Sequence, residues 1–288
     1  MHPELKSHFE AILGIPILKS KAVSGGDITD AYVIESSSDR FFIKTSAKPW
    51  AEQLFTSESR GLKQLGATHT IKVPKVYAEG DFDGTGYLIL EFIESKTPDT
   101  SDFERLGRKL AELHLVSQPN EFGSPFDNYI GHLPQSNTME KSWVTFYVER
   151  RLIPQIQLAE EKGLLSETDI PPKDNLKEVC YTLIGEVTPS LLHGDLWGGN
   201  FLIAMDGTPV LIDPSVYIGH SEVDLAMSRL FGGFGSSFYT AYHELIPPHH
   251  SQKDLTQVYQ LYYLLVHLNL FGNSYRNSVL AIIDKYFH

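Results

Sequence analysis

The sequence predicts an α+β protein built of two lobes, a small strand-rich lobe followed by a larger helical one. Short β-branched and aromatic runs separated by turn residues dominate the first part of the chain, whereas apolar residues at helical spacing dominate the rest. The change falls at "KTPDTS", residues 96–101, which has the composition of a linker. We therefore expect an N-terminal lobe over 1–94 and a C-terminal lobe over 95–288.

The N-terminal lobe is expected to be an antiparallel sheet with one helix. The runs "DAYVIESSS" and "RFFIKTSA" have a hairpin pattern, and residues 87–93 form a further strand pattern. Residues 51–65 carry apolar side chains at helical spacing, and Glu58 lies on that apolar face. Lys44 lies in the apolar strand "FFIK". A buried charge is costly unless an opposite charge meets it, so the two are candidates for an ion pair, although either one alone is more often a solvated charge.

The C-terminal lobe is expected to be mainly helical. The stretch "SDFERLGRKLAELH" opens with the pattern of a capping box, Ser101 with Glu104, ahead of an apolar stripe. The apolar run near residues 258–271 is interrupted by polar residues and is too short to span a bilayer, so we expect a buried core helix. Helices are predicted around residues 101–114, 143–163, 175–186, 255–271 and 278–287.

Charge and cysteine content exclude several classes of function. The formal net charge of −12 argues against nucleic-acid and anionic-membrane partners, which need a positive face, and suits a metal cation or a basic substrate. The single cysteine, Cys180, excludes an intrachain disulfide and a cysteine zinc cluster, and we expect it to be a packing residue. The start "MHPELKSHFEAILG" lacks the pattern of a secretory signal, so we expect a cytoplasmic protein.

The densest group of reactive residues is "LLHGDLWGGN", residues 191–200, followed by "FLIAMDGTPVLIDPS". Two short apolar runs, 201–204 and 210–212, are joined by an Asp-Gly turn and predict a β-hairpin. Paired antiparallel strands lie about 4.8 Å apart, so Asn200 and Asp213, at the open end of the hairpin, should be neighbours. Their carboxamide and carboxylate oxygens are suitable ligands for Mg²⁺.

Asp195 precedes Asn200 by five positions and adds a second acid to the same loop. Phosphoryl transfer needs a metal that neutralises phosphates and an acid that orients the attacking hydroxyl. The order Asp195, Asn200, Asp213 has the spacing pattern of the protein-kinase signature, in which a strand lysine holds ATP phosphates and a helix glutamate holds the lysine. Lys44 and Glu58 fit those two positions. The structural alternative is an ordinary turn with side-chain to backbone bonds.

ATP is therefore the expected cosubstrate, with Mg²⁺ as cofactor. Gly25 and Gly26, in "VSGGDIT", stand where a glycine turn would cover the phosphates, although such a pair alone is more often a hairpin turn. Backbone groups of Glu91, Phe92 and Ile93, at the end of the last strand before the linker, are expected to bind adenine.

"HGDLWGGN", followed by "LIDPS" and "GHSEVDLAM", resembles the fructosamine kinase (ketosamine-3-kinase) family. This family belongs to the protein-kinase-like superfamily, beside aminoglycoside phosphotransferases and choline kinases. The resemblance covers nearly the whole chain, including "SGGDIT", "FFIK", "FGSPFDNYIG" and "RLFGGF". The His-Gly-Asp pattern is shared by the superfamily, whereas the tryptophan after Asp-Leu narrows the resemblance to the family. It implies a bilobal protein-kinase-like fold with ATP in the cleft.

The resemblance also implies roles for single residues. Asp195 matches the catalytic acid, Asn200 and Asp213 match the Mg²⁺ ligands, and Lys44 with Glu58 match the phosphate clamp.

Three further residues take expectations from the resemblance. Trp197 would lie in the acceptor pocket, where its ring can contact a sugar and an ammonium group, and its alternative is a core aromatic. Asp224 and His193 would support the geometry of the catalytic loop. Many members of the family carry a cysteine in the glycine loop, where this chain has Asp27, so a redox switch there is not expected.

The function implied is an ATP-dependent kinase that phosphorylates a hydroxyl, O3, of a ketosamine such as fructosamine, ribulosamine or erythrulosamine, and so supports deglycation. The expected partner is a small ketosamine or a glycated protein lysine, with no nucleic acid and no membrane, and the chain is expected to be a monomer or weak dimer. Two alternatives remain at this stage: a kinase of another alcohol, aminoglycoside-like or choline-like, and an ATP-binding regulator without catalysis.

Overall fold

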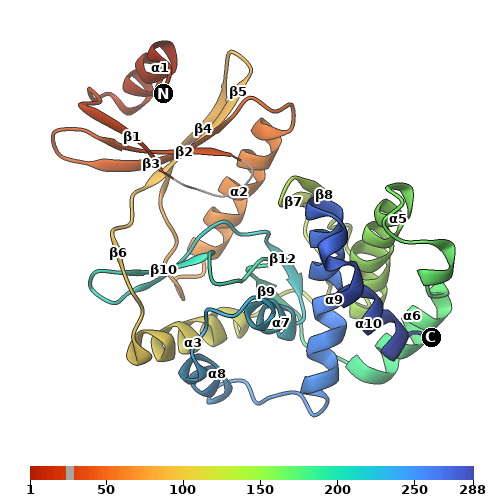
Figure 1. Ribbon diagram of the computed structural model, residues 1–288. Helices are drawn as coiled ribbons and strands as arrows, with labels where there is room; N and C mark the ends of the chain where they lie inside the picture. The colour runs from red at the N-terminus through yellow and green to blue at the C-terminus, as the bar shows by residue number, and fades with distance from the viewer. Residues whose placement is uncertain (24–28) are drawn as a thin grey trace.

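The structure is a computed structural model that describes residues 1–23 and 29–288. It contains a five-stranded sheet formed by the N-terminal part of the chain and a larger helical part with three small sheets (Figure 1). The glycine turn predicted at Gly25 and Gly26, and Asp27 beside it, lie outside the described residues. The lobe boundary after residue 94 stays a prediction.

The five-stranded sheet has the order β1-β2-β3-β5-β4, and every neighbouring pair is antiparallel. Alternating residues of β5 pack on opposite faces: Leu88 and Leu90 lie in one hydrophobic cluster with α2, while Tyr87 and Ile89 lie in another with α1. The elements are α1 Pro3–Leu13, β1 Lys19–Val23, β2 Asp30–Glu35, β3 Arg40–Ser46, α2 Ala51–Gly66, β4 Val76–Phe82 and β5 Thr85–Glu91.

The prediction of one helix in this part of the chain was wrong, because α1 is a second one. Proline occupies its first turn, Gly14 ends it in a left-handed conformation, and Phe9 is fully buried against the sheet. The amphipathic pattern of the first fourteen residues is therefore that of a surface helix that covers the sheet on the side away from α2 (Figure 1).

The alternation along β3 explains why a lysine lies on its buried side. Phe41 and Ile43 pack on the α1 side of the sheet, so Phe42 and Lys44 face α2. Glu58 lies on the buried face of α2. The alternation of side chains along β3 and the helical repeat of α2 thus place Lys44 and Glu58 on facing sides of the two elements.

The helical part is centred on α9, which is buried over most of its length, as predicted for residues 255–271. The helix predicted over 143–163 is interrupted, because residues 148–152 form a π-helical turn, η1 Val148–Leu152. The elements are α3 Thr100–His114, β7 Asn128–Ile130, β8 Leu133–Gln135, α4 Trp143–Tyr147, α5 Ile153–Glu161, η2 Glu167–Asp169, α6 Lys173–Ile184, β9 Ser190–Leu192, β12 Tyr217–Gly219, α7 Glu222–Leu230, α8 Ser236–His243, α9 Gln252–Phe271, η3 Asn273–Tyr275 and α10 Arg276–Tyr286.

The predicted hairpin is present as β10 Phe201–Ala204 and β11 Pro209–Leu211. Its outer edge pairs with β6 Ser95–Lys96, in the segment that connects the large sheet to α3. On its other edge Lys72, from the N-terminal part, forms an isolated parallel bridge with Val210. The hairpin is therefore flanked on both sides by segments that precede the helical part.

The capping box of α3 is Asp99 with Asp102, and the predicted pair of Ser101 with Glu104 was wrong. Asp99 Oδ1 accepts a hydrogen bond from the Asp102 backbone N–H, and Asp102 Oδ2 accepts one from the Asp99 N–H, each at 3.0 Å. The helix begins at Thr100, so Ser101 is already inside its first turn.

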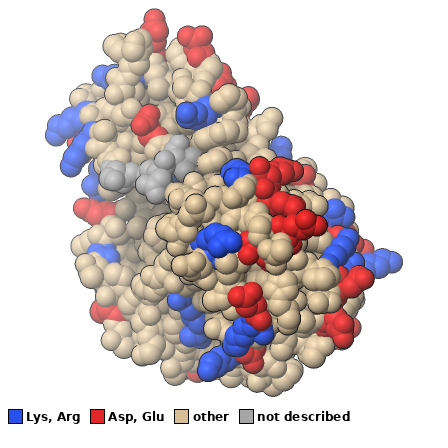
Figure 2. All heavy atoms as spheres, turned by 45° about the vertical axis from the view of Figure 1, so that its right-hand side comes forward, with Lys and Arg blue, Asp and Glu red and all other residues tan. Residues whose placement is uncertain are grey.

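Charged groups of both signs are interspersed over the face shown in Figure 2. Within residues 1–23 and 29–288, none of the helices combines the length and the apolar character needed to cross a membrane. Cys180 is buried in the core as predicted, and burial raises the pKa of its thiol to about 12.

Candidate active site

A cavity of about 560 Å³ lies where β3 and α2 face the loops of the helical part. It brings together side chains from distant parts of the sequence, among them Lys44 and Asp213, which are 169 positions apart. The predicted site residues that line it are Lys44, Glu58, Asp195, Trp197, Asn200 and Asp213.

Lys44 bridges two carboxylates at the inner end of this cavity. Its Nζ donates to Glu58 Oε1 at 2.8 Å and also to Asp213 Oδ1. Burial alone would lower the pKa of Lys44, but the charges of Asp213 and Glu58 outweigh it and raise the pKa. Burial raises the pKa of Glu58, and the Lys44 charge opposes that shift. Lys44 is therefore a permanent cation between the sheet and the hairpin loop.

The open end of the β10–β11 hairpin places Asn200 beside Asp213. The Ile212 backbone N–H donates to Asn200 O at 3.1 Å, which continues the hairpin ladder by one bond. The Asn200 carboxamide nitrogen donates to Asp195 O at 2.8 Å and to Asp195 Oδ2 at 3.2 Å. None of the described hydrogen bonds uses the carboxamide oxygen of Asn200 or Oδ2 of Asp213, so both atoms are available to bind a metal ion.

Asp195 has the environment of a carboxylate that can accept a proton. Burial is the main cause that raises its pKa to about 7, the nearby Asp213 charge raises it further, and the hydrogen bond from Asn200 acts in the opposite direction. Its side chain lines the cavity and is partly exposed there. A raised pKa keeps the carboxylate basic enough to take a proton near neutral pH.

The loop of residues 193–200 is held by a fully buried carboxylate. Asp224 Oδ2 accepts the His193 backbone N–H at 2.7 Å, and Asp224 Oδ1 accepts the Gly194 N–H at 2.9 Å. His193 Nε2 donates to Ile212 O at 2.8 Å, and burial lowers the pKa of His193, so the ring is neutral. Asp224 and His193 thus contact the loop as a structural support does, from behind the cavity.

Trp197 lies at the cavity wall with 40% of its surface exposed, which excludes the alternative of a core aromatic. Its ring covers Gly199, where an added Cβ would lie 2.3 Å from a ring carbon. Glycine at position 199 is therefore what lets the indole lie flat against the loop.

The three residues predicted to bind adenine do not line this cavity. Glu91 ends β5 and pairs through its side chain with Lys72 at 2.9 Å, and the Arg40 guanidinium lies 4.6 Å from the Phe92 ring. These residues and Ile93 lie in the connecting segment, and their predicted contact with adenine stays a prediction. The two glycines of the predicted phosphate turn lie outside the described residues.

Sequence reasoning missed two walls of the cavity. Residues 129–131, in the β7–β8 hairpin, form one wall, and His267 and Phe271 of α9 form another. In the sequence, His267 is visible as a polar residue that interrupts the apolar run. Phe271, at the end of α9, is 48% exposed, so this mostly buried helix still presents a side chain to the cavity. Tyr263 was also missed: its hydroxyl donates to Gly194 O at 2.8 Å inside the core.

Comparison with known proteins assigns this arrangement to a family. The profile of the fructosamine kinase family matches residues 1–288. The chain belongs to the fructosamine kinase family. As a member of this family it is an ATP-dependent kinase that phosphorylates a ketosamine, as the sequence predicted.

Individual proteins agree with membership in the fructosamine kinase family. A protein-ribulosamine 3-kinase of Arabidopsis thaliana, named as chloroplastic, is 38% identical over 277 residues, which are 94% of this chain and 83% of the relative. The crystal structure of a putative fructosamine-3-kinase of Haemophilus somnus superposes with a TM-score of 0.89 at 28% identity, over 99% of this chain and 97% of the other.

The fold extends beyond the fructosamine kinase family. A thermostable mutant of the aminoglycoside phosphotransferase APH(4)-Ia superposes with a TM-score of 0.67 over 97% of this chain and 98% of the other. The identity is 15%, so this likeness concerns the fold alone. The predicted protein-kinase-like fold, with an antiparallel N-terminal sheet and a helical remainder, is confirmed.

Proposed function

We propose that the protein transfers the γ-phosphoryl group of ATP to O3 of a ketosamine carried by an amine, and that this reaction supports deglycation. The observation that carries the proposal is the convergence of Lys44, Asp195 and Asp213 in one cavity with an exposed tryptophan. Phosphate is a better leaving group than hydroxide, so a phosphorylated O3 leaves C3 as inorganic phosphate by elimination, and hydrolysis of the remaining carbon–nitrogen bond by water releases the amine.

Asp195 is proposed as the residue that acts on the acceptor hydroxyl. The hydroxyl proton moves to a carboxylate oxygen of Asp195 as the hydroxyl oxygen forms its bond to the γ-phosphorus, and the bond from phosphorus to the leaving oxygen breaks to give ADP. The hydrogen bond from Asn200 to Asp195 Oδ2 fixes the direction of the carboxylate. Positioning and electrostatics supply most of the acceleration.

The donor set of the cavity fits Mg²⁺ bound together with phosphates. Among the described residues there is no group of three or more His, Cys, Asp or Glu side chains that could hold a metal ion by themselves. Mg²⁺ typically takes one or two protein oxygens and completes its shell with water and phosphates, so Asn200 and Asp213 suffice. When bound, the ion neutralises charge on the phosphates.

The nucleotide is proposed to lie along the boundary between the sheet and the hairpin. Lys44, held by Glu58, would bind the α and β phosphates. Backbone groups of Glu91, Phe92 and Ile93 would bind adenine, and the turn with Gly25 and Gly26 would cover the phosphates.

The acceptor is proposed to bind on the Trp197 side of Asp195. An exposed indole can contact the C–H face of a sugar and the ammonium group of the amine. The cavity is open to solvent at this wall, as the exposure of Trp197 and Phe271 indicates, so a ketosamine on a protein lysine can enter as well as a small one. We further propose that the protein acts in the cytoplasm, as a monomer or weak dimer.

A panel of acceptors tests the proposal. ADP release is measured with fructosyl-, ribulosyl- and erythrulosyl-amines, each as a free amine and on a peptide lysine, beside an aminoglycoside and choline. We expect turnover with at least one ketosamine and none with the last two. Turnover with the aminoglycoside or choline alone would replace the acceptor class, and tight ATP binding without turnover of any acceptor would indicate a regulator.

A further inference from the structure

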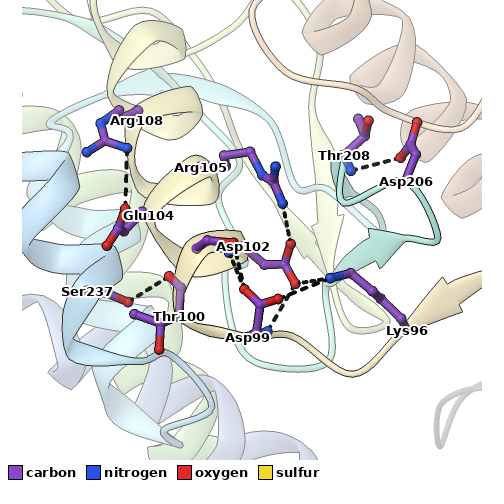
Figure 3. A network of polar contacts seen from close by, with 11 residues as sticks. Lys96, Asp99, Thr100, Asp102, Glu104, Arg105, Arg108, Asp206, Thr208 and Ser237 are labelled. Atoms are coloured by element: carbon purple, nitrogen blue, oxygen red, sulfur yellow. Dashed lines mark hydrogen bonds and ion pairs between the residues drawn. The ribbon is translucent and has the colours of Figure 1, made fainter.

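Four charged side chains form a network outside the cavity, at the crossing from the sheet to the helical part (Figure 3). Asp102 is at its centre and is fully buried. Its carboxylate accepts hydrogen bonds or ion pairs from Lys96 Nζ at 2.6 Å, Arg105 Nη2 at 2.6 Å and the Asp99 N–H at 3.0 Å. We call Lys96, Asp99, Asp102 and Arg105 the linker cluster.

Lys96 connects the linker cluster to the hairpin that carries the proposed Mg²⁺ ligands. Lys96 pairs with Ile203 and Ser95 with Ala204, and the Met205 N–H donates to Glu94 O at 3.2 Å. The connecting segment is thus in fixed register with β10, whose first residue follows Asn200. On the other edge, the Leu211 N–H donates to Lys72 O at 2.9 Å.

The turn of the hairpin packs directly on the linker cluster. Gly207 has φ +81°, and an added Cβ would lie 2.4 Å from Arg105 Nη2 and 3.2 Å from Asp102 Oδ1. A side chain at this position would be strained by the positive φ and would displace the Arg105 guanidinium. Asp102 therefore touches, directly or through one side chain, the connecting segment, helix α3 and the hairpin turn.

These contacts fix the distance between the adenine end and the phosphate end of the proposed nucleotide site. Adenine is proposed at residues 91–93, just before β6, and the Mg²⁺ ion that binds the phosphates is proposed at Asn200 and Asp213, at the open end of the β10–β11 hairpin. Two ends of one ligand would then be held by two segments whose register is fixed by the β6–β10 pairing. A shift of that pairing would move the adenine-binding segment relative to the hairpin. This would weaken nucleotide binding and would leave the rate of the phosphoryl-transfer step nearly unchanged.

We propose that Asp102 is a positioning residue for the nucleotide, which acts through Lys96 to hold the connecting segment in register with the hairpin. The proposal rests on the proposed function, because it takes ATP as the ligand that spans the two segments. Asp102 is 0% exposed and lies outside the cavity, so it acts only through these neighbours.

Asp102→Asn and Lys96→Met test this role. Each removes the charged contact between α3 and the connecting segment, and Lys96→Met leaves the carboxylate paired with Arg105. Calorimetry of the full-length protein with Mg·ADP and Mg·AMP-PNP should show the dissociation constant raised about tenfold for Asp102→Asn and about fivefold for Lys96→Met. The double variant should bind no more weakly than the weaker single variant, because the two residues act as one contact.

Steady-state kinetics separate positioning from general destabilisation. The KM for ATP should rise by the same factors, while the KM for the ketosamine and kcat stay within about twofold. Glu244→Gln is the matched control. It removes the charge that meets Arg108 of α3, whose Nε lies 2.8 Å from Glu244 Oε2 in an exposed contact, and it should leave nucleotide binding unchanged.

Three results would decide against the proposal. Nucleotide affinity within twofold of wild type in both single variants, with only the melting temperature lowered, would make Asp102 a purely structural residue. If the ketosamine KM rose together with the ATP KM, the effect would be global. Failure of the wild-type protein to bind Mg·ADP or Mg·AMP-PNP would overturn the proposed function itself, and this is visible before any variant is made.

Discussion

The active-site cavity and the linker cluster both contain several charged side chains close together, but they differ in net charge. The cavity sets one cation, Lys44, against the carboxylates of Glu58, Asp195 and Asp213. The linker cluster sets Lys96 and Arg105 against Asp99 and Asp102. The first has a net charge of −2 with all groups ionised, and the second is neutral.

The pKa values differ in the same sense. In the cavity, burial raises the pKa of Asp195 to about 7. In the linker cluster, burial also acts to raise the pKa of Asp102, but bonds from Lys96, the Asp99 N–H and Arg105 hold it below its ordinary value. The difference teaches that a neutral, fully bonded network needs no ligand and can hold chain segments in place, whereas an unbalanced group of charges is suited to bind a charged ligand.

The largest expected effect follows from removal of the proposed proton acceptor, Asp195. Asp195→Asn should lower turnover by about a thousandfold or more, because the acceptor hydroxyl loses its base, while Mg·ADP affinity changes little. Activity is measured by ADP release and affinity by calorimetry. Asp206→Asn, which changes an exposed acid in the turn of the β10–β11 hairpin, is the control and should retain activity. Normal turnover of Asp195→Asn would contradict the proposed role of Asp195, and the cavity would then no longer differ from the linker cluster by containing a reactive carboxylate.

Metal removal should have the next largest effect. Chelation of Mg²⁺ by EDTA should abolish turnover and should also abolish the rise in melting temperature that ATP causes, since phosphates without a cation would meet a cavity of net charge −2. Asp213→Asn should lower turnover by about a hundredfold and raise the Mg²⁺ concentration needed for half-maximal activity. Stabilisation by ATP that is unchanged in EDTA would contradict the assignment.

Replacement of the aromatic wall should have a smaller effect, confined to the acceptor. Trp197→Ala should raise the ketosamine KM about tenfold, because the sugar and the ammonium group lose their contact with the indole, and should leave the ATP KM unchanged. Trp197→Phe keeps an aromatic face and should lose less. An equal rise of both KM values would indicate instead that the ring supports the catalytic loop.

The smallest effect concerns stability and pH. A carboxylate whose folded-state pKa is raised carries a stability cost that is absent below its unfolded pKa and complete above its folded pKa of about 7. In metal-free buffer the melting temperature of Asp195→Asn should therefore exceed that of wild type by about 3 °C at pH 8, and the excess should shrink towards pH 4.

Asp99 provides the opposite case for the same measurement. Bonds from the Ser101 hydroxyl and the Asp102 N–H lower its pKa to about 2, so its contribution to stability is present above the unfolded pKa and is lost only as the pH falls towards 2. The difference in melting temperature between Asp99→Asn and wild type should thus be constant from pH 5 to pH 8. A pH-independent difference for Asp195→Asn as well would contradict a raised pKa there.

The predictable part of the site was the part encoded by local pattern. The hairpin that brings Asn200 beside Asp213 follows from two short apolar runs and an Asp-Gly turn, and the direction of Lys44 follows from the alternation of a strand. Buried helix α9 was predictable from its apolar content.

The rest depends on contacts that no local pattern carries. The β7–β8 hairpin lines the cavity because of its tertiary packing, and no pattern within "DNYIGHLPQ" predicts that position. The choice of Asp99 over Ser101 as helix cap depends on Lys96 and Arg105, which stabilise Asp102 as the reciprocal partner. Helix α1 was missed because eleven residues with one buried aromatic are a weak signal until a sheet covers them.

The pairing of β6 with β10 has a consequence for the order of folding. Ser95 and Ala204 meet across more than a hundred intervening residues, and Lys44 reaches Asp213 across 169 positions. Closing loops of this length costs chain entropy before any contact repays it, so such pairings form late. The N-terminal sheet can assemble from local hairpins while the chain is still being made, but the cavity is completed only after Phe271, at the end of α9, has been synthesised, and no shorter nascent chain contains all of its walls.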